Sequence, residues 1–507
     1  MGRPFMSERE VDYSDVQGLV RFGYGKMKQA SYALLRIKDI AAARSWLRSA
    51  TITSAVAMNP PPTTATQVAF TAAGLDALEV SKSVLANFSS EFLTGMTEGS
   101  RARRLGDVGS NAPSQWNWGY ATEMPHVVVM FFAESGQLAT HVQSAKGNLW
   151  NQAFEEMQWL GTADLDGVEP FGFADGISQP QIDWQRQRDV TTPQLDYSNV
   201  VALGEFLLGY PNEYNKYTER PLIDVDSASA NLFAAEDVSE KKDLGRNGTY
   251  LVIRTLEQDV RSFWQFVYER SQGNTSAADD LAAAFVGRTR AGDPLVPIQK
   301  QPIPGIDASD PEQVRKNQFT FHENLSGSRC PFGAHVHRAN PRNSDYPGRP
   351  TGLAKLVTIL GFGPKGFRDD LMSSVRFHRI LRRGREYGPE LKPEETLDPV
   401  PPNDPKRGLH FVCLNANISR QFEFLQNAWM INTKFSGLTG ESDPLLGNRE
   451  QSPGCPVTAD FTKPQENSLA HRVSGLPQFV TVRGGAYFFL PSLRALRYFA
   501  SGDIAAK

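Results

Sequence analysis

Residues 329–342 read Arg329-Cys330-Pro331-Phe332-Gly333-Ala334-His335-Val336-His337-Arg338-Ala339-Asn340-Pro341-Arg342 and hold two of the eight histidines of the 507-residue chain. A neutral imidazole ligates iron, zinc or copper through one ring nitrogen, and the hydrogen bond of the other nitrogen decides which one is free. The three arginines suit a carboxylate-bearing ligand, because a guanidinium matches a carboxylate in charge and geometry. A haem, which has an iron and two propionates, would use both kinds of side chain.

The pair His335 and His337 also has simpler explanations. On an extended segment, residues two apart point to the same face, so both rings would lie together. Such a pair could bind zinc or copper, or it could be two half-buried structural histidines. A metallohydrolase would need a further cluster of histidines or acids, and the sequence shows none. The loop alone leaves these alternatives open.

Composition narrows the class of protein. The chain has 53 basic and 56 acidic residues, well mixed, without the basic stretch of a nucleic-acid binder. Three cysteines (Cys330, Cys413 and Cys455) without a Cys-x-x-Cys pair fit a reducing compartment. The longest apolar run, Val127–Ala133, is too short to span a bilayer, and the N-terminus shows no export signal. We therefore expect a soluble, cytoplasmic protein that binds neither nucleic acid nor membrane.

A strand-then-helix unit occurs twice, which indicates an internal repeat. The first unit runs from Ser31 to Leu47 and the second from Thr249 to Phe266. Each has a tyrosine, three residues, an arginine, an acidic helix start, and then Arg-Ser before an aromatic residue. Further apolar strands are expected at 66–71, 126–132, 408–414 and 478–489. The pattern predicts an α+β fold of two similar halves, each a sheet with helices on one face.

Two further stretches carry candidate chemistry. In Gly172-Phe173-Ala174-Asp175-Gly176, two glycines permit tight turns that could present a carboxylate into a cavity. The aromatic surroundings indicate burial, which should raise the pKa of Asp175 and suit it to proton transfer. The simplest interpretation of the basic stretch Phe377–Gly388 is a strand and turn whose arginines are solvated. One arginine of that stretch in a dry cavity would instead stabilise a developing negative charge.

Four ordered stretches together resemble the dye-decolorizing haem peroxidases. These are the turn 172–176, Asp243-Leu244-Gly245-Arg246-Asn247-Gly248-Thr249-Tyr250, the loop 330–342 and the segment 379–388. The resemblance extends from about Gln17 to Ala500, and the long segments 185–247 and 270–320 are similar to insertions in the larger family members. It implies a dimeric α+β barrel-like fold of two ferredoxin-like halves, placed at 1–200 and 201–507 and forming one haem-binding unit.

The resemblance also implies roles for individual residues. His335 would be the proximal ligand of the iron of haem b, Asp175 the distal acid-base residue and Arg382 the distal arginine. Other expected roles are Leu409 and Phe411 facing the distal pocket, Arg342 and His337 near the propionates, and Tyr387 relaying electrons from bulky donors. The implied activity is reduction of hydrogen peroxide with oxidation of dyes, phenols or other aromatic donors through a ferryl intermediate. A homo-oligomer is compatible with the family.

Two positions depart from the family pattern. Where much of the family has an acidic partner for the proximal histidine, this chain has Asn417, unless another acid supplies the contact. His337 stands where relatives often have arginine, which would make propionate anchoring depend on pH. Two alternative functions use the same loop: a haem-binding protein without peroxidase turnover, and a haem-processing enzyme that releases iron. The motif Gly361–Gly366 fits a dinucleotide fingerprint formally, but Pro364 lies inside the required turn.

Overall fold

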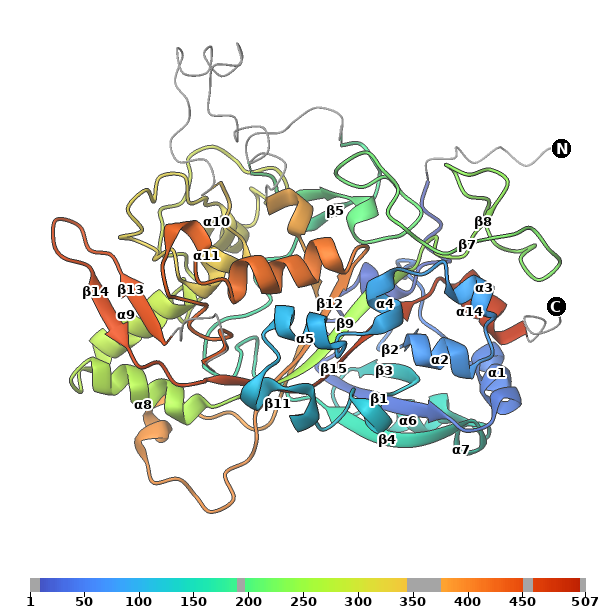
Figure 1. The fold of residues 1–507 in the computed structure, drawn as a ribbon, viewed down its shortest axis with the longest axis horizontal. Coiled ribbons are helices and arrows are strands. Elements are labelled where there is room, and N and C mark those ends of the chain that lie inside the picture. Colours follow the sequence, from blue (N-terminus) through green and yellow to red (C-terminus); the bar gives the residue numbers. More distant parts are fainter. Residues whose placement is uncertain (1–9, 189–196, 344–374, 450–458, 502–507) are drawn as a thin grey trace, which may run out of the picture.

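The computed structural model describes residues 10–188, 197–343, 375–449 and 459–501 (Figure 1). The motif Gly361–Gly366 and Cys455 lie outside these ranges. Within the described residues, no helix is long and apolar enough to cross a membrane.

The first half of the molecule is a four-stranded antiparallel sheet with the strand order β4-β1-β3-β2. Its elements, in chain order, are β1 (Gln29–Ile37), α1 (Ile40–Ser49), β2 (Thr64–Phe70), β3 (Val127–Ala133), α6 (Leu138–Lys146) and β4 (Phe154–Gly161). All seven residues of β3 are buried. A run of valines and phenylalanines suits this position, because both faces of the strand are covered.

The second half repeats this order, with β12 central and two short strands, β10 and β11, along its outer edge. Its elements are β9 (Thr249–Gln258), α8 (Val260–Arg270), β10 (Leu381–Arg382), β11 (Arg385–Tyr387), β12 (Gly408–Asn415) and β15 (Val480–Leu490). The order β15-β9-β12-β10 matches β4-β1-β3-β2 of the first half when strands are compared by their place in the chain. The predicted pair of ferredoxin-like halves is confirmed.

The sequence repeat has a structural cause at the start of each helix. The amide of Ala42 donates to Oδ1 of Asp39 at 2.8 Å, and the amide of Ser262 donates to Oδ1 of Asp259 at 3.0 Å. Each aspartate satisfies a backbone donor that the first helical turn leaves free. The acidic residue after each strand therefore ends the strand and begins α1 or α8.

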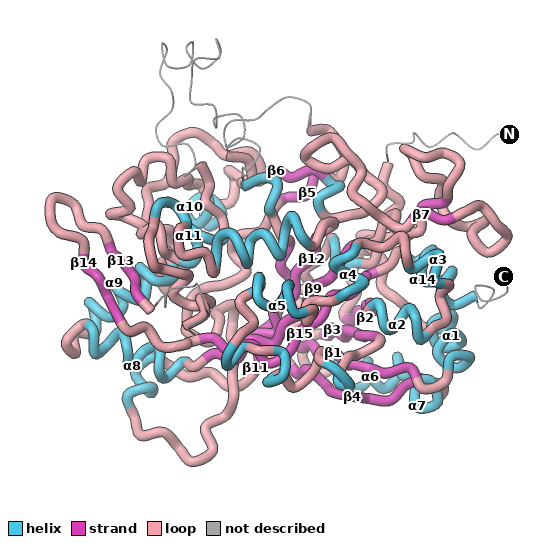
Figure 2. The backbone as a smooth tube through the Cα atoms, viewed as in Figure 1, coloured by secondary structure: helices cyan, strands magenta, loops and turns pink. Residues whose placement is uncertain are grey.

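The two halves join edge to edge. On one side β15 meets β2 through the pair Phe489 and Phe70. On the other side, the amide of Ala163, just after β4, donates to the carbonyl of Glu386 in β11 at 2.7 Å. The strands thus follow one another around a barrel-like sheet, seen as the continuous magenta band in Figure 2.

Helices and small sheets surround this barrel. The remaining α-helices are α2 (Ala72–Ala77), α3 (Lys82–Leu85), α4 (Ser90–Thr94), α5 (Gly99–Leu105), α7 (Trp150–Ala153), α9 (Thr275–Val286), α10 (Pro311–Asn317), α11 (His335–Ala339) and α14 (Leu493–Ser501). The small strands are β5 (Gln181–Asp183), β6 (Val200–Ala202), β7 (Leu222–Ile223), β8 (Lys242–Asp243), β13 (Asp460–Lys463) and β14 (His471–Ser474). Figure 1 shows α1, α2 and α14 at one end, and α8 and α9 at the other.

Two further features concern the organisation of the chain: the segment 85–120 and the boundary between the halves. Residues 85–120 fold into short helices, and the side chain of Trp118 is buried against β15. Its indole donates to the hydroxyl of Thr255, which explains why a polar, glycine-rich stretch carries a large aromatic residue. The predicted division at residue 200 stays a prediction. The segment between β4 and β9 contains Asp175 and the small strands β5 to β8.

Candidate active site

One face of the second half carries Arg382, Leu409 and Phe411. Arg382 of β10 lies directly opposite Cys413 of β12, and paired residues of antiparallel strands point to the same face. Positions 409, 411 and 413 alternate along β12, so they share that face. Leu409 and Phe411 are half-buried whereas the other residues of β12 are buried. A strand in the middle of a sheet with two half-open side chains indicates an internal space beside it.

Asp175 and Arg382 meet at this face. Nη1 of Arg382 donates to Oδ1 of Asp175 at 2.8 Å, and the backbone amide of Arg382 donates to Oε1 of Gln179 at 3.0 Å. The two paired side chains are 31% and 34% exposed, so neither is sealed by protein. The turn of residues 172–176 and the strand β10 are therefore tied together across a space that solvent reaches.

The pKa of Asp175 is lowered, which corrects the prediction from the sequence. Burial raises the pKa of the carboxyl, as predicted, but the charge and hydrogen bond of Arg382, with an amide of Gly176, lower it by more. Asp175 is therefore an anion at neutral pH. In that state it is ready to accept a proton rather than to donate one.

His335 is the first residue of α11 and is held from behind by an acid. Its Nδ1 lies 3.0 Å from Oδ2 of Asp443, whose side chain is fully buried. The other carboxylate oxygen accepts the amides of Leu445 and Leu446 at 2.9 and 2.8 Å. Because Nδ1 is engaged, Nε2 is the nitrogen left to bind a metal. The His335 side chain is 29% exposed, so the ring is not packed against protein on every side.

His335 and the Asp175–Arg382 pair lie within electrostatic reach of one another. Burial lowers the pKa of His335, but the carboxylate of Asp443 raises it by more; Arg382 lowers it and Asp175 raises it. The structure thus brings together three residues that are far apart in the sequence, as the resemblance predicted for the two sides of a haem. The roles themselves stay predictions.

Asp443 takes the position beside His335 that was considered for Asn417. Oδ1 of Asn417 instead accepts the amide of Arg420 at 2.8 Å and the hydroxyl of Ser419 at 3.2 Å. These bonds stabilise the start of the π-helical segments Ser419–Glu423 and Leu425–Met430. The alternative left open by the sequence, a second acid, is the arrangement found. The sequence gives no sign of it, because Asp443 lies 108 residues beyond His335.

His337 does not share a face with His335, because residues 335–339 are helical rather than extended. In a helix, residues two apart point to nearly opposite sides. His337 is fully buried and its ring stacks on Phe321 with centroids 3.9 Å apart and 8° between planes. Burial lowers its pKa to about 4. The described residues contain no cluster of three or more metal-ligating His, Cys, Asp or Glu side chains.

Arg342 and Arg288 supply buried positive charge beside the Asp175 loop. Arg342 donates through Nη2 to the hydroxyl of Ser178 at 2.8 Å and through Nη1 to the carbonyl of Asn317 at 2.8 Å. Burial, with the charges of Arg342 and Arg382, lowers the pKa of Arg288 to about 9. Nε of Arg342 and Nη2 of Arg288 are buried without a hydrogen-bond partner. Sequence reasoning missed Arg288, which follows α9 without any recognisable motif.

These features fit a haem. An imidazole nitrogen is free, apolar side chains line the adjacent face of the sheet, and buried guanidinium groups lack enough acceptors of their own. Two propionates would supply such acceptors, because a buried charged donor is costly when it is left unpaired.

Tyr387 lies on β11, away from the Asp175–Arg382 pair. Its ring stacks on His410 with centroids 4.6 Å apart, and the side chain is half-buried. Burial, with the charge of Glu257, raises its pKa. The structure places the tyrosine on the strand of the second half that meets the end of β4. Its predicted role as an electron relay stays a prediction.

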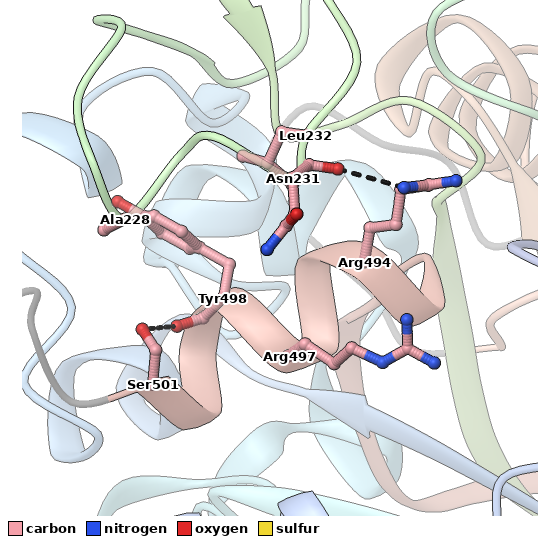
Figure 3. A pocket seen from close by; sticks show the side chains of 7 residues that line it. All are labelled: Ala228, Asn231, Leu232, Arg494, Arg497, Tyr498 and Ser501. Carbon is pink, nitrogen blue, oxygen red and sulfur yellow. Dashed lines mark hydrogen bonds between the residues drawn. The ribbon is translucent and has the colours of Figure 1, made fainter.

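A separate hollow of about 240 Å³ lies between residues 228–232 and α14 (Figure 3). Its lining residues are Ala228, Asn231, Leu232, Arg494, Arg497, Tyr498 and Ser501. None of them forms part of the group around His335, Asp175 and Arg382. Arg494 spans the hollow to the backbone carbonyl of Asn231 at 3.2 Å, which attaches α14 to the segment before β8.

Comparison with known proteins gives one consistent family. A family model described as the DyP dimeric alpha+beta barrel domain matches residues 15–163. Peroxidase 2 of Mycetinis scorodonius is 29% identical over 96% of this chain and 87% of its own length. The dye-decolorizing peroxidase AauDyP1 of Auricularia auricula-judae is 27% identical over 96% and 86%. A solved dye-decolorizing peroxidase in complex with 2,6-dimethoxyphenol has a TM-score of 0.71 at 24% identity, covering 97% of this chain and all of that one, and supports the fold.

Proposed function

We propose a mechanism for this site on the premise that the chain belongs to the dye-decolorizing peroxidase family and is a hydrogen-peroxide-dependent oxidoreductase. Members of this family are haem enzymes, and we infer that the haem here is haem b. Nε2 of His335 would hold its iron, and Arg342 and Arg288 would lie toward its propionates. When bound, the haem supplies the iron that takes up peroxide and the conjugated ring that exchanges electrons.

The residues on the distal side act on the proton and the charge of peroxide. Asp175 is already ionised, so it could accept a proton from one oxygen of hydrogen peroxide and deliver it to the other, directly or through a water. The Arg382 guanidinium donates hydrogen bonds to the departing oxygen as negative charge develops there. The ion pair at 2.8 Å holds both groups in one place before peroxide arrives.

The residues on the proximal side control the imidazole. A buried carboxylate that accepts from Nδ1 fixes the tautomer and makes the ring a stronger electron donor. Asp443 has this position, and two backbone amides keep its other oxygen from rotating away. We infer that this acid, rather than Asn417, adjusts the electron donation of His335.

Aromatic reductants are the donors that we propose. The relative solved with 2,6-dimethoxyphenol is a precedent for a phenolic donor. Leu409 and Phe411 offer an apolar wall where a small aromatic ring could lie. Donors too large for that space would need a redox-active side chain at the outside, and Tyr387 is our candidate.

One observation carries the proposal: the His335–Asp443 pair lies within electrostatic reach of the Asp175–Arg382 pair. The test is an absorption spectrum of the haem-reconstituted protein before and after one equivalent of hydrogen peroxide, repeated with His335→Ala. We expect a Soret band that shifts with peroxide in the parent and is lost or grossly altered in the variant. A normal Soret band that ignores peroxide would indicate a haem carrier. Iron release with a cleaved tetrapyrrole would indicate a haem-processing enzyme.

A further inference from the structure

Glu169 makes an unusual set of contacts within the loop that carries Asp175. Its Oε2 accepts the backbone amide of Phe171 at 3.0 Å, and its Oε1 accepts the amide of Phe173 at 3.0 Å. The carboxylate thus spans alternate amides of the loop, while its own backbone bonds back to the carbonyl of Phe173 at 2.9 Å and accepts the amide of Gly172 at 2.7 Å. Two residues after Phe173, the chain reaches Asp175.

The same carboxylate connects the loop to the barrel. Nε2 of Gln258, the last residue of β9, donates to Oε2 of Glu169 at 2.8 Å. The indole of Trp264 in α8 donates to the carbonyl of Phe171 at 3.0 Å, so the loop is also held from the helix. Glu169 is the one side chain among these that bonds both to the loop and to the sheet. Its loss would free the loop on two sides.

The surroundings of Glu169 leave its charge poorly compensated. Burial raises its pKa to about 7 despite the hydrogen bonds from Phe171, Phe173 and Gln258, and the negative charge of Asp175 raises it further. Arg290, after α9, lies near Gly172 and stacks over Trp264. Beyond Asp175 are its partner Arg382 and Glu386, whose pKa is raised mainly by burial and also by Asp175.

We propose that Glu169 is a positioning residue for the distal aspartate: its carboxylate fixes the loop that aims Asp175, and its negative charge increases the proton affinity of Asp175. The inference rests on the proposed role of Asp175. It assigns to Glu169 a part that neither the sequence motifs nor the comparisons indicated. Ionisation of Glu169 should make Asp175 a stronger base, so the reaction with peroxide should quicken as pH rises through neutrality.

The test compares Glu169→Gln with the parent across pH 4–9, measuring the second-order rate constant for the reaction with hydrogen peroxide by stopped-flow absorption. Glutamine keeps the size but turns an amide toward one of the two loop amides, so we expect a fall of about tenfold at acid pH, since misplaced reacting groups lose rate steeply. The fall should be larger above neutral pH, where the parent also has the charge of Glu169. The inflection near neutral pH should also disappear. Glu155→Gln, on the exposed edge of β4, is the matched control and should resemble the parent.

A uniform fall that keeps the inflection, or a rate within twofold of the parent at all pH, would overturn the proposal. Gln258→Leu keeps the carboxylate and covers the case in which Glu169→Gln fails to fold. Because the Gln258 hydrogen bond lowers the pKa of Glu169, its removal should move the inflection to higher pH. An unmoved inflection would reject the assignment. Asp175→Asn, measured alongside, separates the two ideas: if that variant reacts like the parent, the proposed role of Asp175 fails first.

Discussion

Two aspartates serve the site, and their surroundings differ sharply. Asp443 is fully buried and accepts three hydrogen bonds, one from His335 and two from backbone amides. Asp175 is about one-third exposed, and Arg382 is its only side-chain hydrogen-bond partner within the part of the chain that the structure describes. Neighbouring positive or donating groups lower the pKa of both. The difference teaches that an anion meant to stay charged is enclosed by donors, whereas one meant to exchange a proton is left open on one side.

The largest expected effect comes from removing the charge of Asp175, the partly exposed aspartate. Asp175→Asn keeps the shape but cannot accept a proton, so the rate constant with hydrogen peroxide should fall by about 10²–10⁴. Haem binding should be unchanged, as judged by Soret absorbance per protein. Besides the step expected near neutral pH, the parent rate should have an acid limb below the ordinary pKa of an aspartate, about 4, because the pKa of Asp175 is lowered. The variant should lack that acid limb; a variant that keeps it would assign the limb to another group.

The second largest effect is expected from removing Arg382, the partner of Asp175. Arg382→Leu removes the donors that face the departing oxygen, and we expect the rate constant with peroxide to fall by about 10²–10³. Loss of the guanidinium should also raise the pKa of Asp175, so the acid limb should move to higher pH. Arg383→Leu is a poor control because Arg383 bonds to the backbone of Leu19. Arg472→Leu, on the exposed strand β14, is better and should match the parent.

Removing the charge of Asp443, the buried aspartate, should affect haem binding rather than the reaction with peroxide. Asp443→Asn does not change Asp175 or Arg382, but it weakens the hydrogen bond that holds His335. Haem affinity should therefore drop by about 10–100-fold. Competition for haem with an apoprotein of known affinity measures this. The reduction potential of the bound iron should rise, because the imidazole donates less electron density. If Asp443→Asn held haem as tightly as the parent, the proposed role of Asp443 in supporting His335 would be rejected.

The smallest effect lies outside both pairs. Tyr387→Phe should lower turnover of a bulky dye several-fold while leaving a small phenol unaffected, because only the bulky donor is too large for the space beside Leu409 and Phe411 and needs a relay. Steady-state assays with both donors on one enzyme preparation give the ratio directly. Equal losses for both donors would instead mean that the stacking of Tyr387 on His410 supports the sheet.

Local patterns made most of the fold predictable. The periodicity of the strands and the acidic residue before each helix, such as Asp39 and Asp259, act within a few residues, so the sequence displays them directly. The resemblance then indicated His335, Asp175 and Arg382, and the structure brings these three together.

The errors share a physical cause, which is a partner distant in the sequence. Burial alone predicted a raised pKa for Asp175, but Arg382, 207 residues away, reverses the direction. Asp443 was missed for the same reason. The alternative that put His335 and His337 on one face needed an extended segment, but α11 is a short helix. Tertiary packing decides such short segments more than their own propensities do.

The pairing of β9 with β15 bears on how the protein is made in a cell. Residues Thr249–Gln258 align with Leu490–Val480, so one edge of β9 pairs only after a strand more than 200 residues further along the chain has been made. Until the ribosome has released that strand, this edge of β9 offers unpaired backbone groups to any other chain nearby. Pairing between strands so far apart in the sequence is slow. Nascent chains will therefore aggregate through the unpaired edge of β9 when synthesis is fast. Slower translation at lower temperature should therefore increase the yield of folded protein relative to inclusion bodies.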